Sequence, residues 1–228
     1  MDELIKELKE KTYHYLIKIE EKIKEELEIY SSSRFYDPLK YALEGGKRVR
    51  PLIVLLATDA VGGNFEKSLD AALAIELLHT ESIIHDDIID KEEFRRDKLA
   101  FHTKYGYNLS ILTADFVLGL ILRILSRYED KRILKEVSSA AIRMCEGELW
   151  EMNLKSVTWE EYLEIIKNKT ASLFEVSAII GGIIGKASPK EISYLGSYGL
   201  NLGIAYQLRD DLLDINKKDK IISLLNIE

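Results

Sequence analysis

HTESIIHDDIID, residues His79–Asp90, places three aspartates in an otherwise apolar helical pattern. At about 100° per residue, His79, Asp86 and Asp90 fall on one face of a helix, and the two aspartates lie one turn apart. Like charges at this spacing repel, and the surrounding isoleucines and leucines favour a buried helix, so we expect a cation between the carboxylates and a cavity around it. The alternative is a solvated acidic face at the end of a helix.

The helix that carries this stretch is expected from about Phe65 to Asp90, and its apolar residues cover more than one face, which is typical of a buried helix. Apolar residues with helical spacing recur on both sides of it, and no stretch alternates Val, Ile and Thr between hairpin turns. The sequence therefore predicts an all-α bundle of roughly eight to ten helices. The other expected helices cover residues 2–28, 38–44, 51–61, 109–128, 133–154, 158–184 and 189–217, with a loop or short helix over 91–104. Capping boxes are expected to open the last two helices, at Thr158–Glu161 and at Ser188–Glu191.

The composition favours one domain over residues 1–228, because 228 residues suffice for one core and no Pro/Gly/Ser-rich linker is present. Cys145 is the single cysteine, which excludes an internal disulfide and indicates a reducing compartment. The charged start MDELIKELKE lacks the apolar segment of a secretory signal, and we expect a cytoplasmic protein. No apolar run approaches the ~18 residues of a membrane span. The net charge of −7 argues against general nucleic-acid binding.

A second acidic cluster lies in the last expected helix, where YQLRDDLLD contains Asp210, Asp211 and Asp214, with Gln207 one turn earlier. Two such clusters on separate helices are hard to attribute to chance. If the helices face each other, their carboxylates line one cavity and require divalent cations. Mg²⁺ fits best, because it prefers oxygen ligands and usually binds through few carboxylates plus substrate phosphates. We therefore expect a diphosphate ligand.

Basic residues stand in three places outside these clusters. The first group precedes a proline-started helix, whose N-terminus can bind an anion together with the side chains. The second follows the first acidic cluster, and the third interrupts an apolar helix, where an inward-facing Lys needs an anionic partner. For each group the alternative is a solvated surface cation. The groups are Lys47 with Arg48 and Arg50 in GGKRVRP, Arg95 with Arg96, and Lys169 followed by Thr170.

GGKRVRP, HDDIID followed by RR, KTASLF and YQLRDDLLD occur here in the order found in trans-polyprenyl diphosphate synthases, which include farnesyl and geranylgeranyl diphosphate synthases. The chain resembles this family from about Pro38 to Asp214. The resemblance implies an all-α isoprenoid-synthase bundle, usually a homodimer, with a central cavity between the two Asp-rich helices. It also implies a prenyltransferase that condenses isopentenyl diphosphate with an allylic diphosphate by Mg-assisted ionisation, addition and deprotonation.

The resemblance assigns roles to individual residues. The Mg²⁺ ligands that bridge the allylic diphosphate would be Asp86, Asp90, Asp210 and Asp214. The same diphosphate would contact Arg95, Lys169 and Thr170, and the isopentenyl diphosphate would bind Lys47, Arg50, His79 and Arg96. Gln207 would lie near the charge that develops during the reaction.

Two further features bear on the function. In the family, bulky aromatics four or five residues before the first Asp shorten the product, and here Ser82 and Glu81 stand there, so we expect a geranylgeranyl or longer product. Family chains usually continue for several helices after the second Asp cluster, whereas fourteen residues follow Asp214. The missing part is dispensable, or it is supplied by a partner chain, or the protein binds diphosphates without efficient turnover. The runner-up function is a regulatory subunit of a hetero-oligomeric synthase, whose usual mark is loss of the aspartates. A class I terpene cyclase is disfavoured, because its second motif usually mixes Asn, Ser and Glu.

Overall fold

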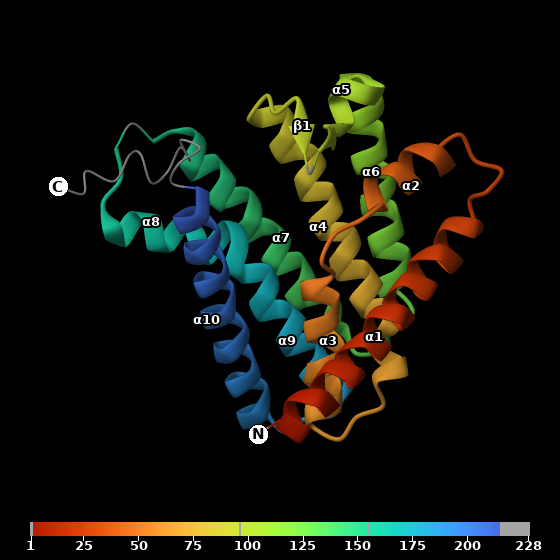
Figure 1. Cartoon of the computed structure of the whole chain (residues 1–228), viewed down its shortest axis with the longest axis vertical. Coiled ribbons are helices and arrows are strands. Elements are labelled where there is room, and N and C mark those ends of the chain that lie inside the picture. Colours follow the sequence, from red (N-terminus) through yellow and green to blue (C-terminus); the bar gives the residue numbers. More distant parts are fainter. Residues whose placement is uncertain (1, 96, 155, 215–228) are drawn as a thin grey trace. The chain divides into compact units, whose positions relative to one another are not determined.

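The structure, a computed structural model, describes residues 2–95, 97–154 and 156–214, and it is almost entirely helical (Figure 1). The all-α prediction is confirmed, and the expected helices are found with shifts of a few residues at their ends, but residues 215–217 of the last expected helix lie outside the described residues. The helical elements are α1 (Asp2–Glu28), α2 (Tyr36–Leu43), α3 (Val49–Ala60), η1 (Phe65–Ser68), α4 (Leu69–Ile89), α5 (Phe101–Tyr105), α6 (Tyr107–Leu125), α7 (Lys131–Met152), α8 (Trp159–Ile166), η2 (Lys167–Ala171), α9 (Ser172–Ile184) and α10 (Pro189–Asp214).

The interval predicted as a loop or short helix contains a small hairpin before α5. Its strands, β1 (Phe94–Arg95) and β2 (Lys98–Leu99), pair antiparallel with two residues each. Asp97 in the turn has a positive φ of 63°, in the left-handed region that short polar residues tolerate best. Two-residue strands carry too little of the alternating pattern to be recognised in the sequence.

The described residues form two compact units, and the division falls within α3. Unit 1 comprises residues 1–55 and 66–129, and unit 2 comprises residues 56–65 and 130–228. The first acidic motif (Asp86, Asp87 and Asp90) belongs to unit 1, and the second acidic motif (Asp210, Asp211 and Asp214) belongs to unit 2. A single domain over 1–228, and a cavity between the two motifs, stay predictions.

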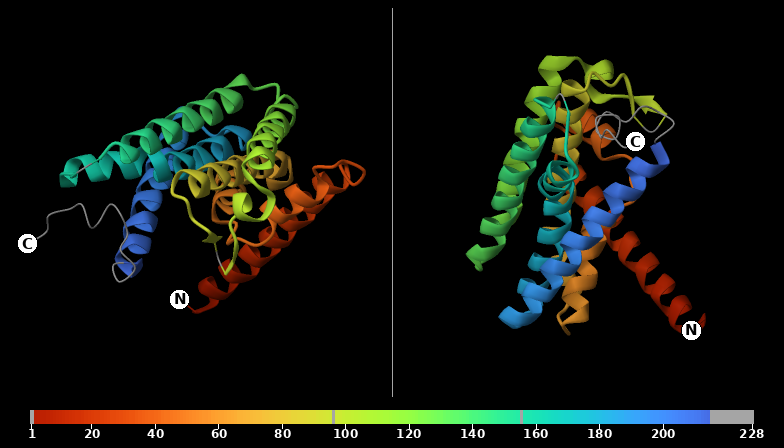
Figure 2. Two further views of the ribbon diagram at one scale, coloured as in Figure 1. Left: turned by 90° about the horizontal axis from the view of Figure 1, so that it is seen from above. Right: turned by 90° about the vertical axis from the view of Figure 1, so that its left-hand side faces the viewer.

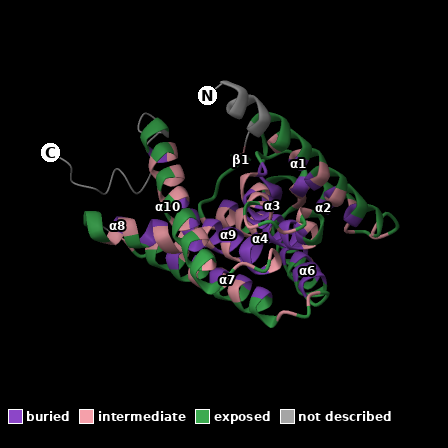
Figure 3. Ribbon diagram, turned by 90° about the horizontal axis from the view of Figure 1, so that it is seen from below, coloured by how far each residue is buried: buried purple, intermediate pink, exposed green. Residues whose placement is uncertain are grey.

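The core of unit 1 is built on α4, whose residues 71–78 are all buried. α1 and α6 pack against α4, and Figure 1 shows α4 and α6 side by side. Figure 2 gives two further views of the helices. Figure 3 shows buried residues on several sides of α4. Burial on several sides explains why the sequence of α4 is apolar all round rather than striped.

Unit 2 is organised around α8, η2 and α9, which follow one another without a break. α7 and α10 pack against both η2 and α9. Two of these contacts are too close for a side chain. A Cβ on Gly147 of α7 would lie 2.5 Å from the Lys169 backbone nitrogen, and one on Gly203 of α10 would lie 2.6 Å from the Ala171 Cα. The helices therefore approach η2 at glycines.

α6 is long and apolar enough to cross a membrane by length and composition, and 44% of its most apolar window is buried within the protein. Core helices of water-soluble proteins meet the same criterion, so this is weak evidence for a span. The absence of a membrane span therefore stays a prediction.

Candidate functional site

The first acidic motif lies at the C-terminal end of α4. Asp86 is half-buried and Asp90 is exposed. The helix ends at Ile89, one residue earlier than predicted, and Asp90 caps it by donating its backbone N–H to the Asp86 carbonyl at 2.8 Å. Carboxylates at this end face the negative pole of the helix dipole, which disfavours them by about 0.3–1 kcal/mol each. A bound cation would offset this cost.

Asp86 and Asp90 fit a magnesium site. Both offer carboxylate oxygens and neither is fully buried, which leaves room for the waters and phosphate oxygens that Mg²⁺ keeps in its coordination shell. Within the described parts of the chain, no three His, Cys, Asp or Glu residues are grouped so as to hold a metal by themselves. The donors that the structure shows at this end of α4 are two carboxylates, and their role as metal ligands stays a prediction.

Asp87, between them, is the buried aspartate of the motif at 1% exposure. Its Oδ1 accepts a hydrogen bond from the Nε of Arg95 on β1 at 2.5 Å. Burial raises the pKa of the Asp87 carboxyl, and Arg95 opposes that rise. Arg95, which is predicted to contact a diphosphate, thus forms a hydrogen bond with the first acidic motif itself. Arg96 lies outside the described residues.

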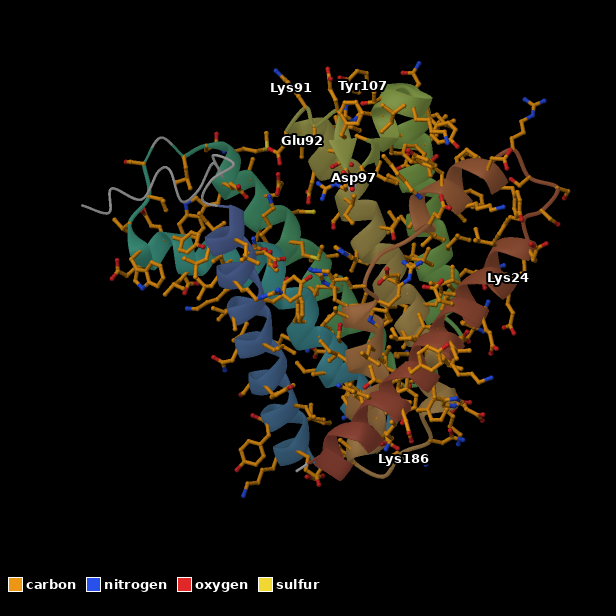
Figure 4. All side chains as sticks on the ribbon, viewed as in Figure 1. Lys24, Lys91, Glu92, Asp97, Tyr107 and Lys186 are labelled. Atoms are coloured by element: carbon orange, nitrogen blue, oxygen red, sulfur yellow. The ribbon has the colours of Figure 1, made fainter. Side chains whose placement is uncertain are left out.

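The hairpin, the end of α4 and the start of α6 meet at one end of unit 1. Figure 4 labels Lys91, Glu92, Asp97 and Tyr107 there. Tyr107 stacks on His102 of α5, with 5.2 Å between ring centroids. Ala100 donates its backbone N–H to the Glu93 carbonyl at 2.8 Å, which closes the hairpin beside α5. These contacts fix the strand that carries Arg95.

The basic segment GGKRVRP contributes one structural arginine. Arg48 is buried with a positive φ of 51°, and its guanidinium lies 2.6 Å from Glu76 and 2.7 Å from Glu20. It also donates to the Leu43 carbonyl at 2.5 Å. A buried Arg keeps its charge only with such partners. Arg48 therefore holds α1 and α4 to the segment instead of facing a ligand.

The other two cations of this segment remain candidates. Arg50 is half-buried and its Nη1 lies 3.0 Å from the Nε2 of His79, while Lys47 is exposed. The structure thus brings together two of the residues predicted to bind isopentenyl diphosphate. His79 precedes Asp86 by two helical turns, about 10 Å along α4. One face of α4 therefore carries His79, with Arg50 of α3 beside it, and Asp86.

In unit 2, the predicted helix from Thr158 to Ile184 contains a π-helical turn, η2. The predicted capping box is present, since the Thr158 hydroxyl accepts from the Glu161 N–H and the Glu161 carboxylate accepts from the Thr158 N–H. π-turns insert one extra residue and often occur at functional sites. η2 contains both Lys169 and Thr170, and the close approaches of α7 and α10 hold it.

Lys169 faces carboxylates of α7. Its Nζ lies 2.5 Å from Glu148 and 2.7 Å from Glu151, and all three side chains are largely buried. The prediction that an inward-facing Lys needs an anionic partner agrees with this arrangement. Its contact with a diphosphate stays a prediction.

The second acidic motif lies on α10. The Asp210 side chain is 35% exposed, with Arg209 3.8 Å away, whereas Asp211 is 4% exposed. Gln207, one turn earlier, accepts a hydrogen bond from Thr170 at 2.9 Å. The structure therefore brings together Thr170 and Gln207 of the predicted set. Asp214 belongs to α10, but its side chain lies outside the described part of the chain.

The sequence interpretation gave no role to Asp87, Asp211 or Tyr162, all of which are buried. Asp87 follows Ile84 by three residues and Asp211 follows Leu208 by three, so each shares a helix face with an apolar residue. The same spacing relates Asp86 to Ile83, so the sequence pattern alone does not single out the buried aspartate of the first motif. Tyr162 donates its hydroxyl to Asp211, a contact between α8 and α10 that periodicity cannot reveal.

Known proteins share the sequence motifs described above. Residues 32–223 match the family model of the polyprenyl synthetases. The chain belongs to the polyprenyl synthetase family. The resemblance inferred from the motifs is confirmed, and with it the isoprenoid-synthase type of helical fold.

Relatives and solved structures of the family cover most of this chain. Geranylgeranyl diphosphate synthase of Methanosarcina mazei is 36% identical over 96% of this chain and 69% of its own. The crystal structure of geranylgeranyl pyrophosphate synthetase from Pyrococcus horikoshii matches with a TM-score of 0.86 and 39% identity, over 95% of this chain and 69% of the other. A polyprenyl synthase from Caulobacter crescentus, complexed with calcium and isoprenyl diphosphate, matches with a TM-score of 0.81 and 29% identity, over 89% and 62%.

The chain spans between 54% and 69% of the length of the curated relatives that it matches. The match to the family therefore concerns the fold and the motifs of this chain. The activity of the longer relatives is a proposal for this chain.

Proposed function

We propose that this chain is a polyprenyl diphosphate synthase, a prenyltransferase that condenses isopentenyl diphosphate with an allylic diphosphate. The observation that carries the proposal is the face of α4 in unit 1. Asp86 and Asp90 lie at its end, and the Arg50–His79 pair lies two turns earlier. A metal-bridged diphosphate and a second diphosphate held by cations are the two groups that such a condensation needs.

The metal ligands in this proposal are Asp86, Asp90, Asp210 and Asp214. When bound, Mg²⁺ stabilises the negative charge of the departing pyrophosphate. The calcium and isoprenyl diphosphate bound by the Caulobacter crescentus protein support a divalent cation and a diphosphate in this family. Arg95, Lys169 and Thr170 would contact the allylic diphosphate and add to that stabilisation.

The isopentenyl diphosphate would bind Lys47, Arg50, His79 and Arg96. The allylic C–O bond breaks and its electron pair leaves with pyrophosphate, so that an allylic cation forms where water is excluded. The isopentenyl double bond supplies the electron pair of the new C–C bond. A proton then leaves for the pyrophosphate and a double bond forms again. Gln207 would lie near the developing charge.

The product in this proposal has twenty carbons or more. Ser82, four residues before Asp86, is small and half-buried, and its hydroxyl donates to the His79 carbonyl at 2.9 Å. A side chain of this size leaves room for a growing chain. Ser82→Phe should shorten the main product, as thin-layer chromatography of the dephosphorylated alcohols would measure.

The functional form in this proposal is a cytoplasmic homodimer of single-domain chains. α6 supports it, because Ile111, Leu118 and Leu122 share one face of the helix and are 54%, 44% and 52% exposed. A face of this kind fits a second copy of the chain. Leu118→Glu should produce monomers in sedimentation velocity, and a dimer unaffected by that change would contradict the use of this face.

The activity is tested with purified protein, radiolabelled isopentenyl diphosphate, Mg²⁺ and dimethylallyl, geranyl or farnesyl diphosphate. We expect butanol-extractable label that EDTA abolishes and Mg²⁺ restores. Asp86→Ala serves as the matched inactive control. No extractable label with any primer would overturn the enzyme proposal, and label that appears only after addition of a second chain would favour the regulatory subunit.

A further inference from the structure

Asp211 is a carboxylate in the interior of unit 2. It is 4% exposed, although its neighbour Asp210 in the same motif has a side chain that is 35% exposed. Burying a carboxylate is costly unless hydrogen bonds compensate it. Asp211 must therefore be held by hydrogen-bond donors inside unit 2.

Two donors occupy its two oxygens. The Tyr162 hydroxyl of α8 donates to Oδ2, and the Gln207 amide donates from Nε2 to Oδ1 at 2.6 Å. The chain of bonds continues on the other side of Gln207, where the Thr170 hydroxyl of η2 donates to Oε1 at 2.9 Å. Four side chains from three elements thus form one hydrogen-bond chain, which runs from Tyr162 through Asp211 and Gln207 to Thr170.

The polarity of this chain follows from Asp211. Oδ1 of Asp211 accepts a hydrogen bond from the NH₂ end of Gln207, which is the only end of the amide that can donate. The Gln207 carbonyl oxygen then points towards Thr170 and accepts the hydroxyl proton. With an amide in place of Asp211, either end of Gln207 could face it.

Tyr162 is placed to keep this arrangement rigid. It is 1% exposed and packs with Val157, Ile165 and Ile166, while Ile204 and Leu208 of α10 border the same cluster. Its ring is therefore fixed by packing, and its hydroxyl has little freedom to turn from Asp211. Because Phe has nearly the same shape, the hydroxyl can be removed without opening a cavity.

We infer that Asp211 and Tyr162 are positioning residues and that Asp211 is not a metal ligand: they fix the orientation of the Gln207 amide and, through it, of the Thr170 hydroxyl. The inference rests on the proposed function, which places Gln207 and Thr170 at the reacting diphosphate. It gives the two adjacent aspartates of the motif different tasks, since Asp210 stays accessible to a cation.

Steady-state kinetics with Tyr162→Phe test the inference. We expect kcat to fall about tenfold, the size of a small misplacement at a reacting group, with little change in the KM for isopentenyl diphosphate. Asp211→Asn should lower kcat further. The matched control is Tyr128→Phe, which removes a hydroxyl that donates to the Lys67 carbonyl at 2.8 Å in unit 1 and should leave kcat unchanged. Equal effects of the two Tyr→Phe variants, or an unchanged kcat in Tyr162→Phe, would overturn the inference.

Side-chain amide NMR tests it without catalysis. The Gln207 NH₂ resonances, assigned by their loss in Gln207→Leu, should include one downfield proton that exchanges slowly with solvent and loses this protection in Asp211→Asn. Freely exchanging Gln207 protons in the unchanged protein, or protection that survives Asp211→Asn, would contradict the inference. If the unchanged protein forms no product, the proposed function fails, and the NMR result alone decides the inference.

Discussion

The two acidic motifs have the same sequence pattern, and in each the second aspartate is buried while the first is more accessible. Asp87 is 1% exposed and Asp211 is 4% exposed. Their partners differ. Asp87 faces a charged guanidinium on a hairpin, whereas Asp211 faces a hydroxyl and an amide on helices. In both DDxxD motifs the second aspartate is therefore buried, but the pattern does not determine which kind of group donates a hydrogen bond to that aspartate.

The difference matters because the two kinds of partner respond to different conditions. The Arg95 side chain is 38% exposed, so solvent and salt screen its attraction to Asp87. Tyr162 is 1% exposed, so its bond to Asp211 is shielded from water and salt. We expect salt to weaken the contact between Asp87 and Arg95 in the first motif. We expect the contact between Asp211 and Tyr162 in the second motif to be unaffected by salt.

The largest expected effect is a loss of catalysis when either accessible aspartate is replaced. Asp86→Ala and Asp210→Ala should each reduce kcat/KM at least about 100-fold, because a lost ligand weakens stabilisation of the departing charge. The free energy of unfolding should change by no more than about 0.5 kcal/mol, since both side chains are partly exposed. Product assays and urea titrations measure the two quantities. Loss of stability with activity retained would make these aspartates structural.

The next effect contrasts the two buried aspartates in the free energy of unfolding. Asp211→Ala should cost about 2–3 kcal/mol, because it leaves the Tyr162 hydroxyl and the Gln207 amide unsatisfied in the interior. Asp87→Ala should cost less than about 1 kcal/mol, since burial already disfavours its charge and Arg95 can turn to solvent. Urea unfolding at pH 7 compares them. Equal losses would show that the partner's chemistry does not matter.

Helix positions were predictable from the sequence because local patterns determine them. The capping boxes at Thr158 and Ser188 are formed as predicted, and each cap hydroxyl accepts the N–H of the Glu three residues later. The buried face of α4 likewise followed from its apolar residues. Boundaries of this kind need no information about distant parts of the chain.

Two local features of the site could not be predicted, because contacts distant in sequence determine them. The π-turn at Lys169 lies against Gly147 of α7, where a Cβ would clash with its backbone. Similarly, GGKRVRP shows three cations but not that Arg48 is held by Glu20 and Glu76. Residue types were thus predictable, whereas the choice between a ligand contact and an internal partner was not.

A smaller effect concerns a polar residue shortly before each motif, Gln207 three residues before Asp210 and Glu81 five residues before Asp86. Gln207 is neutral and bonded, whereas Glu81 has a buried Oε2 without a hydrogen-bond partner in the described structure. Burial, with a contribution from Asp115, raises the pKa of Glu81 to about 7. The folded state therefore holds this proton at pH values where the unfolded chain, with its value of 4.5, has lost it. Stability attributable to Glu81 declines as the pH rises from about 4.5 to about 7.

Glu81→Gln should remove this decline. At pH 8 we expect the variant to be more stable by about 1–2 kcal/mol, less than the full shift would give because solvent reaches the half-buried side chain. Near pH 4 the two proteins should be equally stable. Urea unfolding at both pH values measures the difference, with Glu66→Gln on the exposed surface of η1 as control. A difference independent of pH would contradict the role of the Glu81 charge.

The smallest expected effect is the coupling energy between each buried aspartate and its partner, which double-mutant cycles measure. The coupling between Asp87 and Arg95, from Asp87→Asn and Arg95→Gln, should be about 0.5–1 kcal/mol in low salt and should shrink in 0.5 M KCl, because mobile ions screen a partly exposed pair. The coupling between Asp211 and Tyr162, from Asp211→Asn and Tyr162→Phe, should be the same at both salt concentrations, since burial keeps ions away and the hydroxyl carries no net charge. Equal salt dependence of the two couplings would mean that both second aspartates are held in the same way.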